Sequence, residues 1–236
     1  MKKQSKTWAS PSLGEKMKLS ITGEEGTPVL WLTTTKSDGK PDTGILKSGI
    51  GFQLENGFNK VYEVQCLNDE ILLSTDSTPR QRIVRYGQFE SYIIDEVVPF
   101  ILKDSDNDFI IVAGVGTGAY HASNLMFKHP EKFGKLISIC GPFNNRRFYG
   151  DYFDDDVYYN NPAEFIPYLD DEQILGRIRE SDLRIVSSFY DPYKVEAIEL
   201  TENLDIRSID YQLDIWGEER PLDDETFAEM LKNHIP

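Results

Sequence analysis

The sequence has few of the residues that most often carry chemistry. It contains 236 residues but only two cysteines, Cys66 and Cys140, and three histidines. Two cysteines cannot form a disulfide framework, and together with so few histidines they are too few for a typical zinc site. We therefore expect reduced thiols and no bound metal.

Positive charge is also scarce. The chain carries 25 Lys and Arg against 40 Asp and Glu, which gives a formal net charge of −15. A field of this sign repels phosphate backbones and anionic lipid headgroups. We therefore expect neither nucleic acid nor a membrane surface as a partner.

Long hydrophobic runs are absent as well. The first residues, Met1 to Trp8, carry positive charge as a signal peptide does, but no apolar run follows them. No later stretch is long enough to span a bilayer. The sequence therefore predicts a cytoplasmic protein.

What the chain does contain is enough apolar surface for a core. Hydrophobic residues make up 39% of it and aromatic residues 12%, and its length fits one domain over residues 1–236. Apolar or β-branched runs alternate with helix-like segments, which is typical of an α/β fold with a mostly parallel sheet and helices on both faces. The runs that predict strands are Met17–Ile21, Pro28–Thr34, Lys60–Cys66, Phe109–Ala113, Lys135–Cys140, Leu183–Phe189 and Ile209–Trp216.

One helix has a clear start signal. Pro79 suits a first helical position, and Thr78 with Gln81 forms a capping-box pattern ahead of a helix that we expect to reach Leu102.

Residues 144–170 are expected to form a short surface excursion. Its acid-rich part, 150–161, lacks the alternating oxygens and the bend glycine of a calcium loop, so no metal is expected there.

The segment from Phe109 to Ala122 reads as a strand, a tight turn of small residues and a helix. One interpretation is a dinucleotide fingerprint, but the next strand ends in Cys140-Gly-Pro and not in the acidic residue that holds a ribose. We therefore expect no cofactor. The other interpretation is the nucleophile elbow Gly-x-Ser-x-Gly, with Gly116 in the place of the serine.

The segment Gly114–Phe133 resembles the elbow region of a bacterial esterase family in the α/β-hydrolase superfamily, whose version runs roughly Gly-x-Ser-Met-Gly-Ala-Tyr-His-Ala-x-Asn-Phe. The resemblance implies an α/β-hydrolase fold over nearly the whole chain. Further segments that resemble this family are Trp8–Pro11, Arg85–Phe100, Ile139–Phe143, Asp155–Pro162 and Trp216-Gly217.

The departures from this family fall on its catalytic positions. Acyl transfer by a serine hydrolase needs a nucleophile, a base and an acid that orients the base. The resemblance places Gly116 at the nucleophile and Leu222 at the histidine base, so neither can act. Only Asp191 stands where the triad acid is expected. The three triad positions, Gly116, Asp191 and Leu222, therefore form a degenerate triad, and we assign no catalytic residue.

Two other residues are candidate nucleophiles. Thr117 follows the elbow position, and Cys140 ends a strand at the sheet edge where α/β proteins bind ligands. The histidines offer no convincing base. The resemblance gives His121 a packing or orienting role, while His129 ends a helix and His234 lies next to the C-terminus.

Our leading hypothesis is a non-catalytic α/β-hydrolase-like protein that has kept its site or surface for binding a small ester-like or acyl ligand, a protein partner or a second copy. The alternative is an esterase or acyltransferase that uses Thr117 or Cys140. The expected binding residues are Gly116, Thr117, Gly118, Cys140 and Asp191. The strand ends expected at the same edge are Thr33–Thr35, Cys66–Asn68 and Cys140–Phe143.

Overall fold

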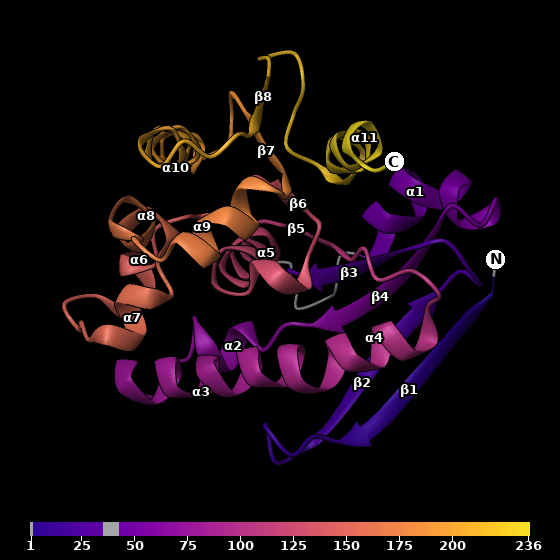
Figure 1. The fold of residues 1–236 in the computed structure, drawn as a ribbon, viewed down its shortest axis with the longest axis horizontal. Coiled ribbons are helices and arrows are strands. Elements are labelled where there is room, and N and C mark those ends of the chain that lie inside the picture. The colour runs from indigo at the N-terminus through magenta and orange to yellow at the C-terminus, as the bar shows by residue number, and fades with distance from the viewer. Residues whose placement is uncertain (1, 35–42) are drawn as a thin grey trace.

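The computed structural model describes residues 2–34 and 43–236, so Thr35 of the expected sheet edge lies outside the described residues. The fold is built on one sheet with the order β1-β2-β4-β3-β5-β6-β7-β8 (Figure 1). Its strands are β1 Lys3–Ala9, β2 Lys16–Thr22, β3 Thr27–Thr33, β4 Asn59–Gln65, β5 Ile111–Val115, β6 Lys135–Ile139, β7 Asp182–Ser188 and β8 Gln212–Trp216.

Adjacent strands are parallel within the series β4-β3-β5-β6-β7-β8, and β2 runs antiparallel to both β1 and β4. The predicted α/β class with a mostly parallel sheet is therefore confirmed. The α-helices are α1 Thr43–Glu55, α2 Asn68–Ile71, α3 Pro79–Ser91, α4 Val98–Asp104, α5 Thr117–Lys128, α6 Arg146–Tyr149, α7 Asp155–Tyr159, α8 Pro162–Phe165, α9 Glu172–Arg179, α10 Lys194–Ile206 and α11 Asp224–His234.

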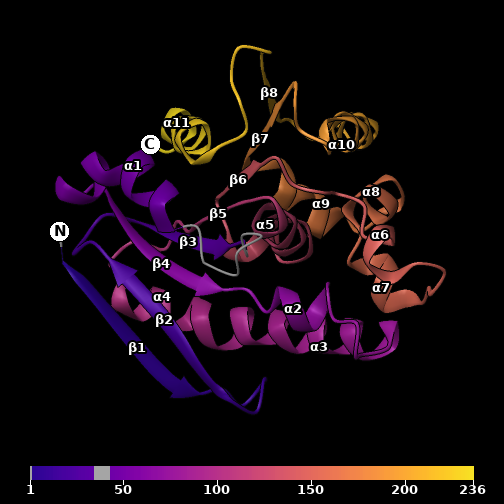
Figure 2. The ribbon, with the colours of Figure 1, turned by 180° about the vertical axis from the view of Figure 1, so that it is seen from behind.

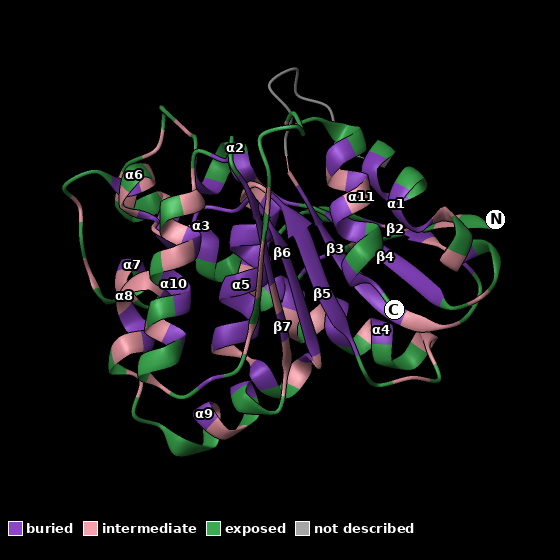
Figure 3. Cartoon of the chain, turned by 90° about the horizontal axis from the view of Figure 1, so that it is seen from above, coloured by how far each residue is buried: buried purple, intermediate pink, exposed green. Residues whose placement is uncertain are grey.

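Helices cover both faces of the sheet and divide the core in two. Helices α1 and α11 pack together over one face, and α3, α4, α5, α9 and α10 lie on the other (Figures 1 and 2). The central strands β3, β5 and β6 are buried along almost their whole length, whereas the outer sides of the helices are exposed (Figure 3). This explains why the central strands read as continuous apolar runs.

The edge strand β1 was not predicted from the sequence. Its residues, Lys-Gln-Ser-Lys-Thr-Trp-Ala, are mostly exposed and show no apolar alternation. Its anchor comes from Glu96, whose carboxylate accepts hydrogen bonds from Trp8 Nε1 at 2.6 Å, Ser10 Oγ at 2.7 Å and the Ser12 N–H at 3.1 Å. The Trp-x-Ser-Pro segment is therefore a structural clasp between the chain start and a distant helix.

The long helix expected from Pro79 to Leu102 is present but not uniform. Its capping box forms as predicted, with Thr78 accepting from the Gln81 N–H and the Gln81 side chain accepting in return. Between α3 and α4 the chain forms a π-helical turn, η1, over Tyr92–Val97. This turn carries Glu96. Single π-helical turns inside α-helices are rare, and many occur at functional sites.

Residues 144–170 leave the sheet after β6 and form α6, α7, α8 and the 3-10 turn η3, Ile166–Tyr168. A second 3-10 turn, η2, covers Pro130–Lys132 after α5. Among the described residues, no helix combines the length and the apolar character that crossing a membrane requires.

We expect Glu96→Ala to lower the free energy of unfolding by about 2 to 3 kcal/mol, because three donors at the clasp lose a charged acceptor. Burial alone raises the pKa of Glu96, but the hydrogen bonds from Ser10, Trp8 and Ser12 outweigh it and lower the pKa. Urea denaturation at pH 7 measures the loss. Asp95→Ala, which removes an exposed carboxylate next to Glu96, is the matched control and should change stability little. Equal losses in both variants would contradict the clasp.

Candidate functional site at the elbow

The turn between β5 and α5 has the backbone shape of a nucleophile elbow. Gly116 lies at φ 57° and ψ −122°, directly between the strand and the helix. A serine in this position is strained in α/β-hydrolases, whereas glycine reaches positive φ without steric cost. Among the residues that the structure describes, a Cβ atom on Gly116 would meet only Thr34 Oγ1, at 3.5 Å. These described residues therefore leave space for a nucleophilic side chain at Gly116.

The two outer glycines of the motif serve packing. A Cβ on Gly118 would lie 2.1 Å from the Leu32 carbonyl oxygen, and one on Gly114 would lie 2.4 Å from the Gly118 carbonyl carbon. No larger residue fits without moving backbone. These glycines let α5 begin directly against β3 and β5.

The start of α5 also offers backbone donors. The first N–H groups of a helix have no acceptor within it, and Gly116 has no side chain that could accept from them. In a working elbow, the N–H of the residue after the nucleophile binds the oxyanion. That residue here is Thr117, the first residue of α5.

The Thr117 side chain joins three strand ends. Its Oγ1 lies 2.8 Å from Thr34 Oγ1 and accepts a hydrogen bond of 3.1 Å from Asn68 Nδ2. Thr34 follows β3 and Asn68 begins α2 after β4, so the expected convergence of these segments is observed. Asn68 therefore binds the oxygen that a threonine nucleophile would use for attack.

Behind Asn68 lies a buried histidine. His121 Nε2 is 2.7 Å from Asn68 Oδ1 and its Nδ1 is 3.3 Å from the Tyr86 hydroxyl, which accepts from Asn124 Nδ2 at 2.8 Å. An amide oxygen only accepts, so Nε2 carries the proton and Nδ1 accepts from Tyr86. Burial lowers the pKa of His121 to about 3. The neutral His121 ring donates to the Asn68 amide oxygen and so orients this side chain. It makes no hydrogen bond to Thr117 among those of the described residues.

The aspartate expected as triad acid is buried and held by donors. Asp191 Oδ2 accepts from Ser187 Oγ at 2.7 Å, and Oδ1 accepts from the Tyr193 N–H at 2.8 Å. The Cys140 thiol is close enough to this carboxylate to lower the pKa of Asp191. Burial raises the pKa of Asp191, and these hydrogen bonds lower it in part. The structure therefore brings together Cys140 and Asp191.

Cys140 is buried directly after β6 at φ 49°, a positive value that is uncommon for a residue with a side chain. Burial first, and then the neighbouring Asp191 carboxylate, raise the pKa of the thiol. A reactive cysteine needs the opposite, a lowered pKa in an electropositive setting. The buried Cys140 thiol beside Asp191 therefore lacks the setting of a reactive cysteine.

Leu222 occupies the position of the expected base and has a structural role. Asp223 caps α11 by accepting from the Thr226 N–H at 2.9 Å, which places Leu222 just before the cap and Phe227 at the fourth helical residue. These are the positions of a hydrophobic staple. Both side chains pack on the core between the sheet and helices α1 and α11.

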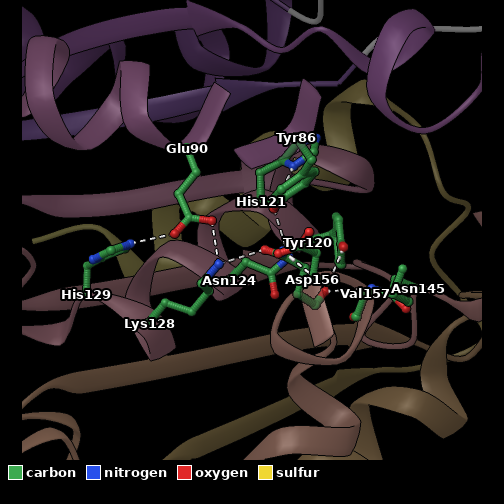
Figure 4. Close-up of polar contacts among 11 residues, drawn as sticks. Tyr86, Glu90, Tyr120, His121, Asn124, Lys128, His129, Asn145, Asp156 and Val157 are labelled. Carbon is green, nitrogen blue, oxygen red and sulfur yellow. Dashed lines mark hydrogen bonds and ion pairs between the residues drawn. The ribbon is translucent and has the colours of Figure 1, made fainter. Parts of the chain in front are cut away.

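The two remaining histidines pair with carboxylates elsewhere. His129 Nε2 lies 2.7 Å from Glu90 Oε1, and Lys128 also binds Glu90, which ties the end of α5 to α3 (Figure 4). His234 Nε2 lies 3.1 Å from Asp214 Oδ2 on β8. Figure 4 also shows His121 beside Tyr86, apart from the Glu90 group.

Two residues of the elbow network were missing from the expected binding residues. Thr34 and Asn68 fell only within the broad strand-end ranges, because an isolated threonine or asparagine after a strand has no distinctive pattern. Two cavities formed by described residues lie away from the elbow. One of about 410 Å³ lies between α1 and strands β1, β2 and β4, and one of about 530 Å³ lies near Lys60 and Asp104.

The low pKa of His121 predicts a specific acid sensitivity. An unfolded histidine binds a proton below about pH 6.5, whereas the folded site binds one only near pH 3, so stability falls as pH drops between these values. We expect His121 to account for a loss of about 2 to 3 kcal/mol between pH 7 and pH 4.5. Urea denaturation of His121→Gln should show a pH dependence shallower by this amount. Identical pH slopes for the variant and the natural protein would contradict the burial of a neutral ring.

No family model and no curated protein sequence matches the chain. Solved structures do resemble it. A ferulic acid esterase superposes with a TM-score of 0.71 at 15% identity, covering 100% of this chain and 96% of the other. An S-formylglutathione hydrolase from Staphylococcus aureus gives 0.70 at 14% identity, covering 99% and 97%.

A second S-formylglutathione hydrolase, from Agrobacterium tumefaciens, gives a TM-score of 0.70 at 14% identity and covers 98% of this chain and 92% of its own. Likeness at such low identity establishes the fold and not the activity. The full-length overlap agrees with the sheet order and the elbow described above. The chain therefore has the fold of the α/β-hydrolase superfamily, as its resemblance to a bacterial esterase family implied.

Proposed function

We propose that the protein is a non-catalytic α/β-hydrolase-like protein that binds a small ester-like or acyl ligand at its elbow. The observation that carries this is Gly116, which keeps the elbow backbone and the adjoining space without a nucleophilic side chain. The N–H groups at the start of α5 support recognition of a carbonyl or carboxylate oxygen. The ligand class follows from that polar half-site and from the esterase and hydrolase activities named for the structural neighbours.

The remaining catalytic positions support the same conclusion. Leu222 packs as part of a helix start, where the resemblance expects a base. Asp191 accepts hydrogen bonds from Ser187 and the Tyr193 N–H. An acid with no histidine to orient contributes no general-base chemistry.

The alternative, an esterase with a different nucleophile, needs an activated Thr117 or Cys140. Activation requires a base that takes the proton, or a lowered pKa. Thr117 Oγ1 instead accepts a hydrogen bond from Asn68, and the pKa of Cys140 is raised. These contacts favour the non-catalytic proposal over the alternative.

We expect p-nitrophenyl butyrate to be hydrolysed in the presence of the natural protein no faster than in buffer alone. We also expect that a fluorophosphonate does not label the protein. The double variant Gly116→Ser with Leu222→His should gain turnover at least about tenfold above the natural protein, because nucleophile and base then join Asp191. Its rate should saturate with ester concentration, since the binding half of the site is kept. A rate that stays linear in ester concentration would mean that the elbow site does not bind the proposed class of ligand.

Single variants serve as controls for this experiment. Gly116→Ser without the histidine should remain near background, because removing one triad member costs nearly as much as removing all. Thr117→Ala and Cys140→Ala, each made in the natural protein, test the alternative. If the natural protein hydrolyses the ester and one of these changes abolishes the activity, the proposal is wrong.

A further inference from the structure

Much of the negative charge of the chain gathers in one surface region, residues 150–172, which we call the acidic excursion. It includes α7, α8 and η3 and leads into α9, on the left in Figure 1. Residues 148–176 contain no Lys, Arg or His. Their acidic residues are Asp151, Asp154, Asp155, Asp156, Glu164, Asp170, Asp171 and Glu172.

The acidic excursion also exposes aromatic rings. Phe153 is 48% exposed, Tyr159 56% and Tyr168 74%. Tyr158 joins them, with its ring centroid 6.4 Å from that of Phe153 and 5.0 Å from that of Tyr159. Burial first, and then the neighbouring Tyr159 and Tyr168, raise the pKa of Tyr158. Clustered exposed aromatic side chains are typical of binding surfaces, where Tyr and Arg supply most of the affinity.

The excursion already binds two arginines of its own chain. The Arg146 guanidinium lies 3.7 Å from the ring centroid of Phe153, and its Nε donates to Glu164 at 2.7 Å. Arg80 Nη1 donates to Asp154 at 2.5 Å and to Asp156 at 2.6 Å. Stacking on a ring together with pairing to a carboxylate is the recognition that a guanidinium favours.

Other carboxylates and rings of the acidic excursion have no basic partner among the described residues. Within the described part of the chain, Asp151, Asp155 and Asp170 form no ion pair. Tyr159 and Tyr168 have no guanidinium or ammonium group stacked on them among the described residues. Among the described residues, the arginines that bind the acidic excursion therefore leave some of its exposed rings and carboxylates unpaired.

We propose that the acidic excursion is the docking surface for an arginine-rich segment of a partner protein. Guanidinium groups of the partner stack on Tyr159 and Tyr168 and pair with Asp151 and Asp155. Complementary charge brings the partner segment to this surface, and the rings select arginine over lysine because a planar guanidinium stacks better than an ammonium. The inference is independent of ligand binding at the elbow.

Two blocked, fluorescent peptides of alternating arginine or lysine with glycine test the proposal by anisotropy at physiological salt. We expect the arginine peptide to bind several-fold more tightly than the lysine peptide. Tyr159→Leu with Tyr168→Leu keeps the net charge and most apolar area, and should weaken arginine-peptide binding about tenfold. Asp151→Asn with Asp155→Asn should weaken both peptides.

Matched controls separate a specific surface from general attraction to an acidic protein. Glu24→Gln with Glu25→Gln removes the same charge from an exposed turn elsewhere, and Phe52→Leu removes a 67% exposed ring on α1. Both should bind the arginine peptide like the natural protein. If the tyrosine variant also binds like the natural protein, or if the glutamate variant weakens binding as much as the aspartate variant, the proposal is overturned. Thermal melting confirms that each variant is folded.

Discussion

The fold around the elbow depends on how closely α5 approaches β3 and β5. The two outer glycines, Gly114 and Gly118, leave no room for a Cβ because backbone atoms of the neighbouring elements occupy it. This contact fixes where α5 begins and holds the ends of β3, β4 and β5 at one edge, where Thr34, Asn68 and Thr117 meet. The outer glycines are therefore needed whether or not the site is catalytic, and a Gly-x-x-x-Gly elbow motif is evidence of the fold and not of activity.

On the proposed function, the positions that the esterase resemblance assigns to catalysis contribute stability in this chain. A serine at a positive φ costs on the order of 1–3 kcal/mol, and Gly116 holds the same backbone without this strain. Leu222 adds apolar packing to the start of α11, and Asp191 accepts hydrogen bonds that order the turn after β7. Enzymes commonly lose stability at strained active sites, so removing the chemistry allows such gains. The polar chain from Thr117 to His121 remains because a buried histidine without partners would be costly.

The sequence predicts those parts of the molecule whose burial leaves a pattern. Central strands such as β5 and β6 are apolar on both faces, and the capping box at Thr78 has its own local signature. Strand β1 escaped prediction because an exposed edge strand held by a distant Glu96 carries no apolar alternation. The role of Asn68 likewise arises only from tertiary contacts, since nothing local distinguishes it from any asparagine after a strand. Family resemblance assigns Gly116 and Leu222 to catalytic positions, but only the structure shows which residues surround them.

Net charge is a coarse description of this molecule, because it says nothing of where the charges lie. A value of −15 predicts repulsion of anionic partners by the chain as a whole, but charges act over a Debye length of about 8 Å at physiological salt, which is shorter than a domain. The acidic excursion concentrates negative charge beside exposed rings, while the β1–β2 edge carries Lys3, Lys6, Lys16 and Lys18. A partner near one surface is attracted or repelled by that surface, not by the average of the molecule. The distribution of charge, which only the fold determines, therefore decides which partners an acidic protein of this kind can bind.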